Sequence, residues 1–169
     1  MTSLSAAPRL APRSAASIVA LAAAALLVAV FAMQYLGGLA PCSLCVWQRW
    51  PHGAAVLLGG LAFLPAVSDS GRRALLLLCA AAFATTAGIG LYHVGVEQGV
   101  FAGPSACSGT LSGGTVEELR RALMAAPVVR CDEVPWSLFG ISLAGYNVLA
   151  SSALALFSLG AALCGRKAG

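Results

Sequence analysis

The stretch Ser17–Leu36, SIVALAAAALLVAVFAMQYL, carries no charged residue and decides the fold class. A helix that spans a membrane needs about 20 consecutive, mostly apolar residues. Three further stretches have the length and composition to span: Val46–Val67, Ala74–Val94 and Phe139–Leu163. We therefore predict an all-α membrane protein, an antiparallel four-helix transmembrane bundle.

The overall composition excludes an ordinary soluble protein. Of the 169 residues, 59% are hydrophobic and only 9% are charged, whereas soluble domains are about 25% charged. The net charge of +4 reflects the basic residues that lie outside or near the ends of the predicted spans. The sequence has no basic stripe with interleaved aromatic residues, which a nucleic-acid-binding surface would show. We therefore expect membrane lipid as a partner and no nucleic acid.

The basic residues predict the orientation, because Lys and Arg gather on the cytoplasmic side of membrane proteins. With four spans both termini share one side, and that side collects Arg9, Arg13, Arg72, Arg73, Arg166 and Lys167. Fewer basic residues fall on the opposite side, namely Arg49, Arg120, Arg121 and Arg130. We expect cytoplasmic termini, with disordered tails over residues 1–16 and 164–169 around a four-span domain over 17–163. A cleaved signal peptide is the alternative for the first span. The apolar run of this span, however, is longer than the apolar h-region of a signal peptide.

The long loop on the outer side, residues 96–135, contains a predicted short helix. Thr115-Val116-Glu117-Glu118 matches a capping box, and Val116, Leu119 and Leu123 fall on one helical face. The sequence leaves open whether this helix lies on the bilayer surface or packs on the spans.

Four cysteines lie in two pairs outside the predicted spans. Cys42 and Cys45 form a C-x-x-C motif, and Cys107 and Cys131 flank the polar part of the outer loop. Pro41 is suited to the first turn of a helix, so Cys42 and Cys45 should lie near a helix N-terminus, where a thiolate is stabilised.

Three interpretations of these pairs remain open from the residues alone. They form a redox relay, two structural disulfides in an oxidising compartment, or an all-cysteine zinc site. Cys79 and Cys164 fall in or at the end of spans and are assigned no role.

Three other residues lie beside the cysteine pairs. Arg49 follows Cys45 by four residues, so on a helix its guanidinium would hold that sulfur as a thiolate or contact a ligand carbonyl. A snorkelling arginine is the alternative. His93 and Glu97 have the same spacing and predict a proton relay or a ligand contact, with a local surface ion pair as the alternative.

Two longer motifs resemble the disulfide bond formation protein B (DsbB) family. The first is Pro41–Arg49, PCSLCVWQR, and the second is Cys131–Asn147, CDEVPWSLFGISLAGYN. Tyr92–Glu97, YHVGVE, is similar to the end of the family's third helix. The resemblance covers residues 17–163.

The resemblance implies a quinone-linked thiol oxidase of the bacterial inner membrane that reoxidises a periplasmic, DsbA-like thioredoxin-fold protein. By analogy, Cys107 and Cys131 react with that partner, and Cys42 and Cys45 then reoxidise the loop pair. We expect this exchange to pass through a transient Cys42–Cys131 cross-link.

The same resemblance implies roles at the quinone, either ubiquinone or menaquinone. Cys45 would pass electrons to it, Arg49 would contact it, and His93 would lie near its pocket. Glu97, which takes the place of a glutamine in well-studied members, is also counted among the expected cofactor-binding residues.

Overall fold

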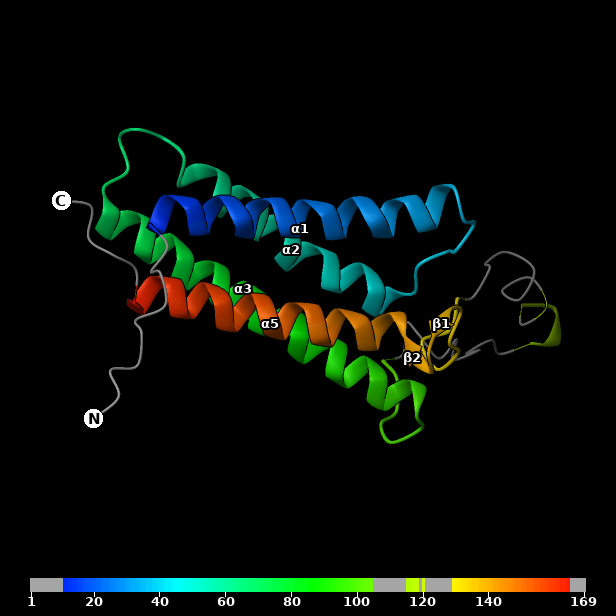
Figure 1. The fold of residues 1–169 in the computed structure, drawn as a ribbon. Coiled ribbons are helices and arrows are strands. Elements are labelled where there is room, and N and C mark those ends of the chain that lie inside the picture. The colour runs from blue at the N-terminus through cyan, green and yellow to red at the C-terminus, as the bar shows by residue number, and fades with distance from the viewer. Residues whose placement is uncertain (1–10, 105–114, 119, 121–128, 165–169) are drawn as a thin grey trace, which may run out of the picture.

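The computed structural model describes residues 11–104, 115–118, 120 and 129–164, and this part of the chain is mostly helical. Its long helices are α1 (Pro12–Tyr35), α2 (Ser43–Leu61), α3 (Asp69–Glu97) and α5 (Leu143–Cys164). They run side by side along one axis, and α3 packs most extensively against α5 and α2. In Figure 1, the start of α1, the α2–α3 turn and the end of α5 lie at one end of the bundle.

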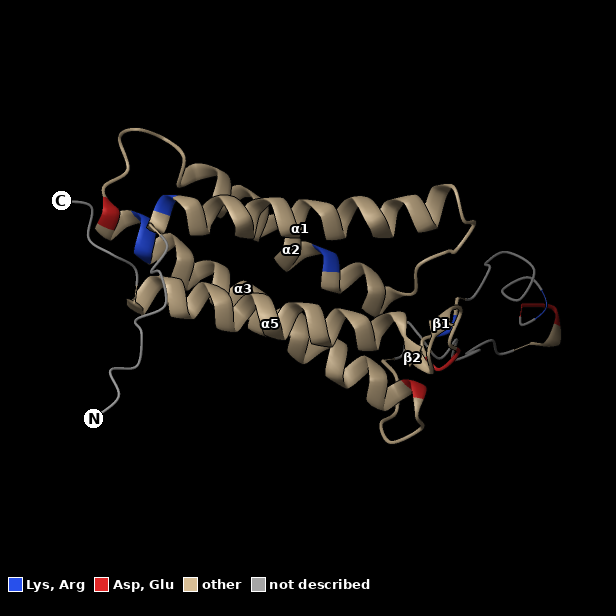
Figure 2. Cartoon of the chain, viewed as in Figure 1, with Lys and Arg blue, Asp and Glu red and all other residues tan. Residues whose placement is uncertain are grey.

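Three of these helices, α1, α3 and α5, are long and apolar enough to cross a membrane. The α2 helix is shorter and carries Gln48, Arg49, Pro51 and His52, so the fourth span stays a prediction. Leu21, Val28, Leu57 and Leu156 are large apolar side chains with more than half of their surface exposed, which is the outward face expected in lipid. In Figure 2 the charged positions gather toward the ends of the bundle, and the basic position within α2 belongs to its only Lys or Arg, Arg49.

The first helix begins earlier than the sequence analysis predicted. Residues 12–16 were assigned to a disordered tail, but α1 starts at Pro12, and Pro12, Ala15 and Ala16 are buried. Proline is preorganised for the first helical turn, and the small alanines allow this turn to pack on its neighbours. The remainder of the predicted tail, residues 1–10, lies outside the described residues.

The second and fourth predicted spans also differ from the helices at their ends. The α2 helix ends at Leu61, and residues 62–67 form turns, held where the Arg72 Nε donates to the Ala62 carbonyl at 3.0 Å. The α5 helix begins at Leu143 rather than at Phe139. A two-stranded antiparallel hairpin, β1 (Ser137–Leu138) and β2 (Ile141–Ser142), precedes it.

The hairpin turn explains why the helix starts late. Phe139 and Gly140 have φ values of 51° and 76°, and two-residue hairpin turns of type I′ need positive φ at both central positions. The turn points the chain back over the end of α3, where the Ser142 Oγ donates to the Glu97 carboxylate.

The predicted loop helix is described in part. Residues 116–118 are helical, and the Glu118 N–H donates to the Thr115 Oγ1 at 3.3 Å, which is one of the two bonds of a capping box. The side chains of Leu119 and Leu123 lie outside the described residues, so the predicted apolar face stays untested.

Small residues let α1 and α2 approach closely. A Cβ added to Gly59 would lie 2.8 Å from the Ala20 Cβ, while a Cβ on neighbouring Gly60 would meet nothing within 4 Å. Alongside them, Ala16, Val19, Ala23 and Ala55 form part of the buried core. The interface therefore depends on the absence of a side chain at position 59.

This contrast predicts opposite effects for two neighbouring substitutions. Gly59→Ala should destabilise the detergent-solubilised protein by about 1–3 kcal/mol, because the methyl group overpacks the α1–α2 interface. Gly60→Ala is the matched control and should not destabilise, since alanine is the better helix former. Thermal unfolding measures both, and equal melting temperatures for the two variants would contradict the packing.

Candidate functional site

Cys42 caps the N-terminus of α2. Its backbone is extended, and its sulfur accepts the main-chain N–H of Cys45 at 3.3 Å, as a helix N-cap does. Pro41 lies just before the cap. The Cys42 and Cys45 sulfurs are 3.1 Å apart, and both cysteines are free thiols. The predicted position of the C-x-x-C motif at a helix start is confirmed.

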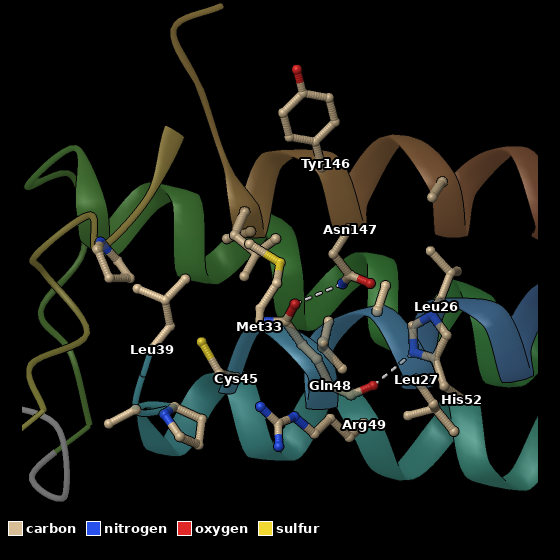
Figure 3. Close-up of a pocket in the computed structure, with 18 residues that line it drawn as sticks. Leu26, Leu27, Met33, Leu39, Cys45, Gln48, Arg49, His52, Tyr146 and Asn147 are labelled. Carbon is tan, nitrogen blue, oxygen red and sulfur yellow. Dashed lines mark hydrogen bonds between the residues drawn. The ribbon is translucent and has the colours of Figure 1, made fainter. Parts of the chain in front are cut away.

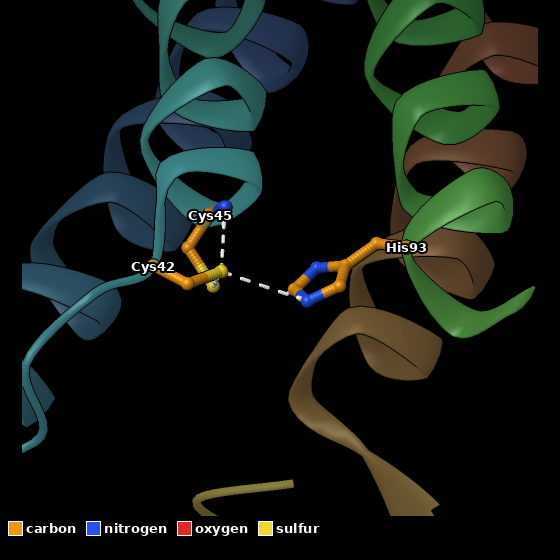
Figure 4. Close-up of side chains that lie close together, drawn as sticks. All are labelled: Cys42, Cys45 and His93. Carbon is orange, nitrogen blue, oxygen red and sulfur yellow. Dashed lines mark hydrogen bonds between the residues drawn. The ribbon is translucent and has the colours of Figure 1, made fainter. Parts of the chain in front are cut away.

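His93 of α3 approaches Cys42 from across the bundle. The imidazole Nε2 lies 3.6 Å from the Cys42 sulfur, and Figure 4 shows the Cys42, Cys45 and His93 side chains converging. The imidazole is almost fully buried, with 4% of the side chain exposed.

Glu97 lies one helical turn further along α3. Its Oε1 is 3.8 Å from the His93 Nε2, and its Oε2 accepts the Ser142 hydroxyl at 2.5 Å. Only 3% of the Glu97 side chain is exposed. His93 and Glu97 therefore do form a pair, but it is buried beside a sulfur rather than placed on the surface.

Cys131 reaches the same place from the outer loop. It is buried, packs with Cys42, Leu44 and Val96, and its sulfur lies 3.7 Å from the Ser43 hydroxyl. The His93 ring also donates a hydrogen bond to the Cys131 main-chain oxygen. Cys131 is disulfide-bonded, whereas its predicted partner Cys107 lies outside the described residues.

The surroundings of Cys42 favour its thiolate. A hydrogen bond from the Cys45 thiol lowers the pKa of Cys42 most, burial opposes this, and contributions from His93 and the Cys45 N–H lower it further, to about 4. A thiolate at this position is a nucleophile in disulfide exchange at neutral pH.

A cavity of about 260 Å³ borders Cys45 and lies between α1, α2 and α5. Its lining is mostly aliphatic, including Leu26, Leu27, Val30 and Met33, and Figure 3 shows Leu39 toward one end and His52 toward the other. The polar side chains in the lining are Cys45, Gln48, Arg49, His52, Tyr146 and Asn147. A mostly apolar cavity with a few polar groups is typical of a small-molecule or cofactor site.

Arg49 lies along this cavity beside Cys45. Its Nη1 donates to the Gln34 Oε1 at 2.6 Å, and its guanidinium stacks 4.9 Å from the centre of the Phe31 ring. These contacts hold the cation inside the bundle, so the snorkelling alternative does not describe this arrangement. His93 and Glu97 do not line the cavity, and they lie on the Cys42 side of the dithiol.

Sequence reasoning missed the polar side chains that join the helices behind the dithiol. Gln48 and Asn147 were quoted within motifs but given no role, and Thr86, His52 and Ser151 were not considered. Polar residues inside an apolar span are a functional signal in themselves, and that signal was present in the sequence.

The remaining cysteines and the zinc interpretation have separate outcomes. Cys79 is buried in the core and Cys164 is exposed at the end of α5. An all-cysteine zinc site would need a Cys131 thiolate, but this cysteine is disulfide-bonded. A different set, Cys42, Cys45 and His93, has ligand atoms within 4.8 Å of one another.

Comparison with known protein families matches residues 12–161 to the model of the disulfide bond formation protein DsbB. The chain belongs to the DsbB family. A disulfide bond formation protein B of Marinobacter nauticus is 33% identical over 147 residues, covering 84% of this chain and 86% of that relative. The namesake protein of a Polaromonas species is 30% identical over 157 residues, covering 88% and 89%.

A protein of Rickettsia prowazekii described as uncharacterized is 24% identical over 144 residues, covering 83% of this chain and 78% of that relative. No solved structure matches the chain significantly. Membership in the DsbB family supports a membrane oxidoreductase that forms disulfide bonds, which confirms the resemblance seen in the sequence.

The Cys42 thiolate makes a testable prediction for the reduced protein. Its ultraviolet thiolate absorbance should be present at pH 7 and disappear as the pH falls through about 4, far below the ordinary value of 9.0. Because the folded-state pKa is the lower one, the thiolate stabilises the fold most above pH 9, and this contribution is lost as the pH falls to about 4.

Two variants test the cause of this shift. Cys45→Ala removes the donor with the largest effect, so the midpoint should move upward, while Cys45→Ser keeps a donor and should move it less. A reduced native protein without thiolate absorbance at pH 7 would contradict the proposed environment.

Proposed function

We propose that the chain reoxidises a periplasmic, DsbA-like dithiol protein of thioredoxin fold and passes the electrons to a quinone. The observation that carries the proposal is the placement of the C-x-x-C pair. Cys42 faces the buried Cys131, while Cys45 faces an apolar cavity that also contains Arg49. One dithiol thus borders both Cys131 of the second pair and an apolar cavity.

The first two steps exchange disulfides. The partner's dithiol reduces the loop pair, Cys107 and Cys131, and becomes a disulfide. The loop dithiol then reduces the Cys42–Cys45 disulfide and is itself reoxidised, through a transient bond between Cys42 and Cys131. Each exchange moves two electrons and two protons and needs no other oxidant.

The last step starts from the reduced Cys42–Cys45 pair. The dithiol must then lose two electrons and two protons as its S–S bond forms, and a bound quinone supplies the two-electron acceptor.

The cavity fits the head group of such a cofactor. Its aliphatic walls suit an apolar ring, and its volume matches a substituted ring better than a long isoprenoid tail. Arg49 would hydrogen-bond a ring oxygen, since its guanidinium is held in place by Gln34 and Phe31. His93 and Glu97, which were expected near the quinone, are better suited by position to act on Cys42.

We also propose the bacterial inner membrane as the location, with both termini cytoplasmic. This orientation places the C-x-x-C motif and the outer loop in the periplasm, where disulfides persist. The sequence supports it, because six Lys and Arg residues are expected on the cytoplasmic side and four on the other.

A direct assay tests the relay. Purified protein is mixed with a reduced DsbA-like protein and ubiquinone, and quinone reduction is followed together with the partner's thiols. Cys42→Ser and Cys45→Ser should each abolish turnover, because each removes one sulfur of the only dithiol beside the cavity in the described part of the chain. Cys164→Ser is the control and should stay active. Turnover that survives loss of Cys42 or Cys45 would refute the relay.

Arg49 provides a separate test of the cavity. Arg49→Gln should raise KM for the quinone on the order of tenfold or more, because a hydrogen bond from a charged donor contributes about 1.5–3 kcal/mol. Arg49→Lys should have a smaller effect, since it keeps the charge but not the planar fork. Arg13→Gln makes the same charge change at the far end of the bundle and should leave KM unchanged. Equal KM values in Arg49→Gln and the native protein would place the quinone elsewhere.

A further inference from the structure

A continuous run of hydrogen bonds crosses the interior of the bundle from α5 through α2 to α3. The Asn147 Nδ2 lies 2.6 Å from the Gln48 Oε1, and the Gln48 Nε2 lies 3.0 Å from the His93 Nδ1. Figure 3 shows the Asn147–Gln48 bond beside the cavity. Because the NH₂ group of an amide only donates and its oxygen only accepts, fixing the donor at one end of the run fixes the donor in every hydrogen bond along it.

A main-chain carbonyl fixes the donor at the α5 end. The Asn147 Nδ2 is 3.3 Å from the Thr86 carbonyl oxygen, which can only accept. It also lies 3.2 Å from the Thr86 Oγ1, whose own proton is donated to the Gln48 carbonyl at 3.1 Å. On its other side, the Asn147 Oδ1 accepts the Ser151 hydroxyl at 3.1 Å. Asn147 therefore presents its NH₂ group, and not its oxygen, to Gln48.

The same donor-to-acceptor order continues from Gln48 to His93. Because the Gln48 oxygen accepts from Asn147, its NH₂ group faces the His93 Nδ1 and donates to it. A neutral imidazole whose Nδ1 accepts carries its proton on Nε2. That nitrogen is the one 3.6 Å from the Cys42 sulfur and 3.8 Å from the Glu97 carboxylate.

We propose that Asn147 and Gln48 are positioning residues that hold His93 in its Nε2–H tautomer, with the proton on the side of the ring that faces the Cys42 sulfur and the Cys131 main-chain oxygen. A donor at this place stabilises the Cys42 thiolate, and so the reduced form of the Cys42–Cys45 pair. Stabilising the reduced form makes a disulfide a stronger oxidant, which suits a pair that must oxidise another dithiol. We call this arrangement of Asn147, Gln48 and His93 the tautomer lock. Its functional meaning rests on the proposed thiol-oxidase activity, whereas the tautomer itself does not.

The same lock opposes metal binding at Cys42, Cys45 and His93. Zinc needs the lone pair of Nε2, so the proton would have to move to Nδ1, where it would meet the Gln48 NH₂ group. The three ligand atoms are close enough for a metal, but the tautomer is the wrong one. A reduced dithiol in the periplasm is thereby kept available for disulfide exchange.

A glycine on α3 makes room for the lock. A Cβ added to Gly90 would lie 3.0 Å from the Asn147 Nδ2 and 2.9 Å from the Val148 Cγ2. A Cβ on Gly88 would meet nothing within 4 Å. Gly90→Ala thus displaces Asn147 without removing any polar group, and Gly88→Ala is its matched control.

The test is nitrogen-15 NMR of the histidine rings in the reduced protein, with no quinone or partner present. The His93 signals are identified by their loss in His93→Gln. The native protein and Gly88→Ala should show His93 with the proton on Nε2, whereas Gly90→Ala should show a mixture of tautomers. A proton on Nδ1 in the native protein would overturn the proposal.

A second variant reverses the direction of the run. Gln48→Glu has the same shape but only accepts, so it should draw a proton onto the His93 Nδ1. Carboxylate–histidine pairs favour metal ligation, and zinc affinity of the reduced protein should rise on the order of tenfold or more. An unchanged tautomer and unchanged zinc affinity in Gln48→Glu would overturn the lock.

These readouts separate the lock from the proposed function. If the native protein has the proton on Nε2 but shows no quinone-linked oxidation, the lock stands and the thiol oxidase fails. If oxidation is active and the proton is on Nδ1, the oxidase stands and the lock fails.

Discussion

The side chain of Gln48 joins three helices in the interior of the bundle, and the geometry of the site depends on it. It contacts His93 of α3 and Asn147 of α5, while its own main-chain oxygen accepts from Thr86 and His52. Buried polar groups away from water must find partners, and each one left unpaired costs several kcal/mol in hydrocarbon. This requirement sets how α2, α3 and α5 are rotated against one another, and so which side chains face Cys42.

The two sulfurs of the C-x-x-C motif therefore have different environments although they are three residues apart. Cys42 caps the helix and meets a buried histidine, a carboxylate and the loop cysteine Cys131. Cys45, one turn into the helix, borders an aliphatic cavity. A single helix start thus separates the side that we propose exchanges disulfides from the side that we propose binds the quinone. The charged groups, Glu97 and Arg49, are placed on opposite sides of the dithiol.

The sequence predicted the parts of this arrangement that are local in the chain. Apolar length predicted the helices, Pro41 predicted the helix start at the cysteines, and i, i+4 spacing predicted the His93–Glu97 pair. Family resemblance, now confirmed by comparison, supplied the link to disulfide-bond formation. The long-range contacts could not be predicted in this way. Gln48 meets residues 45 and 99 positions away in the chain, and no periodicity of one helix specifies which face of another helix it will meet.

Two features escaped prediction for other physical reasons. The hairpin before α5 depends on a phenylalanine with positive φ, which side-chain patterns do not signal. The early start of α1 depends on tertiary packing of Pro12, Ala15 and Ala16, which outweighed a composition typical of a tail.

The central claim is that electrons pass between the two cysteine pairs through Cys42 and Cys131. Disulfide mapping of a variant that carries both Cys45→Ser and Cys107→Ser tests it most directly, because each pair then retains only its exchanging sulfur. We predict that peptide mapping of the air-oxidised protein will find a Cys42–Cys131 disulfide in most molecules. A protein in which Cys42 stays reduced, or bonds to Cys79 or Cys164 instead, would contradict the account.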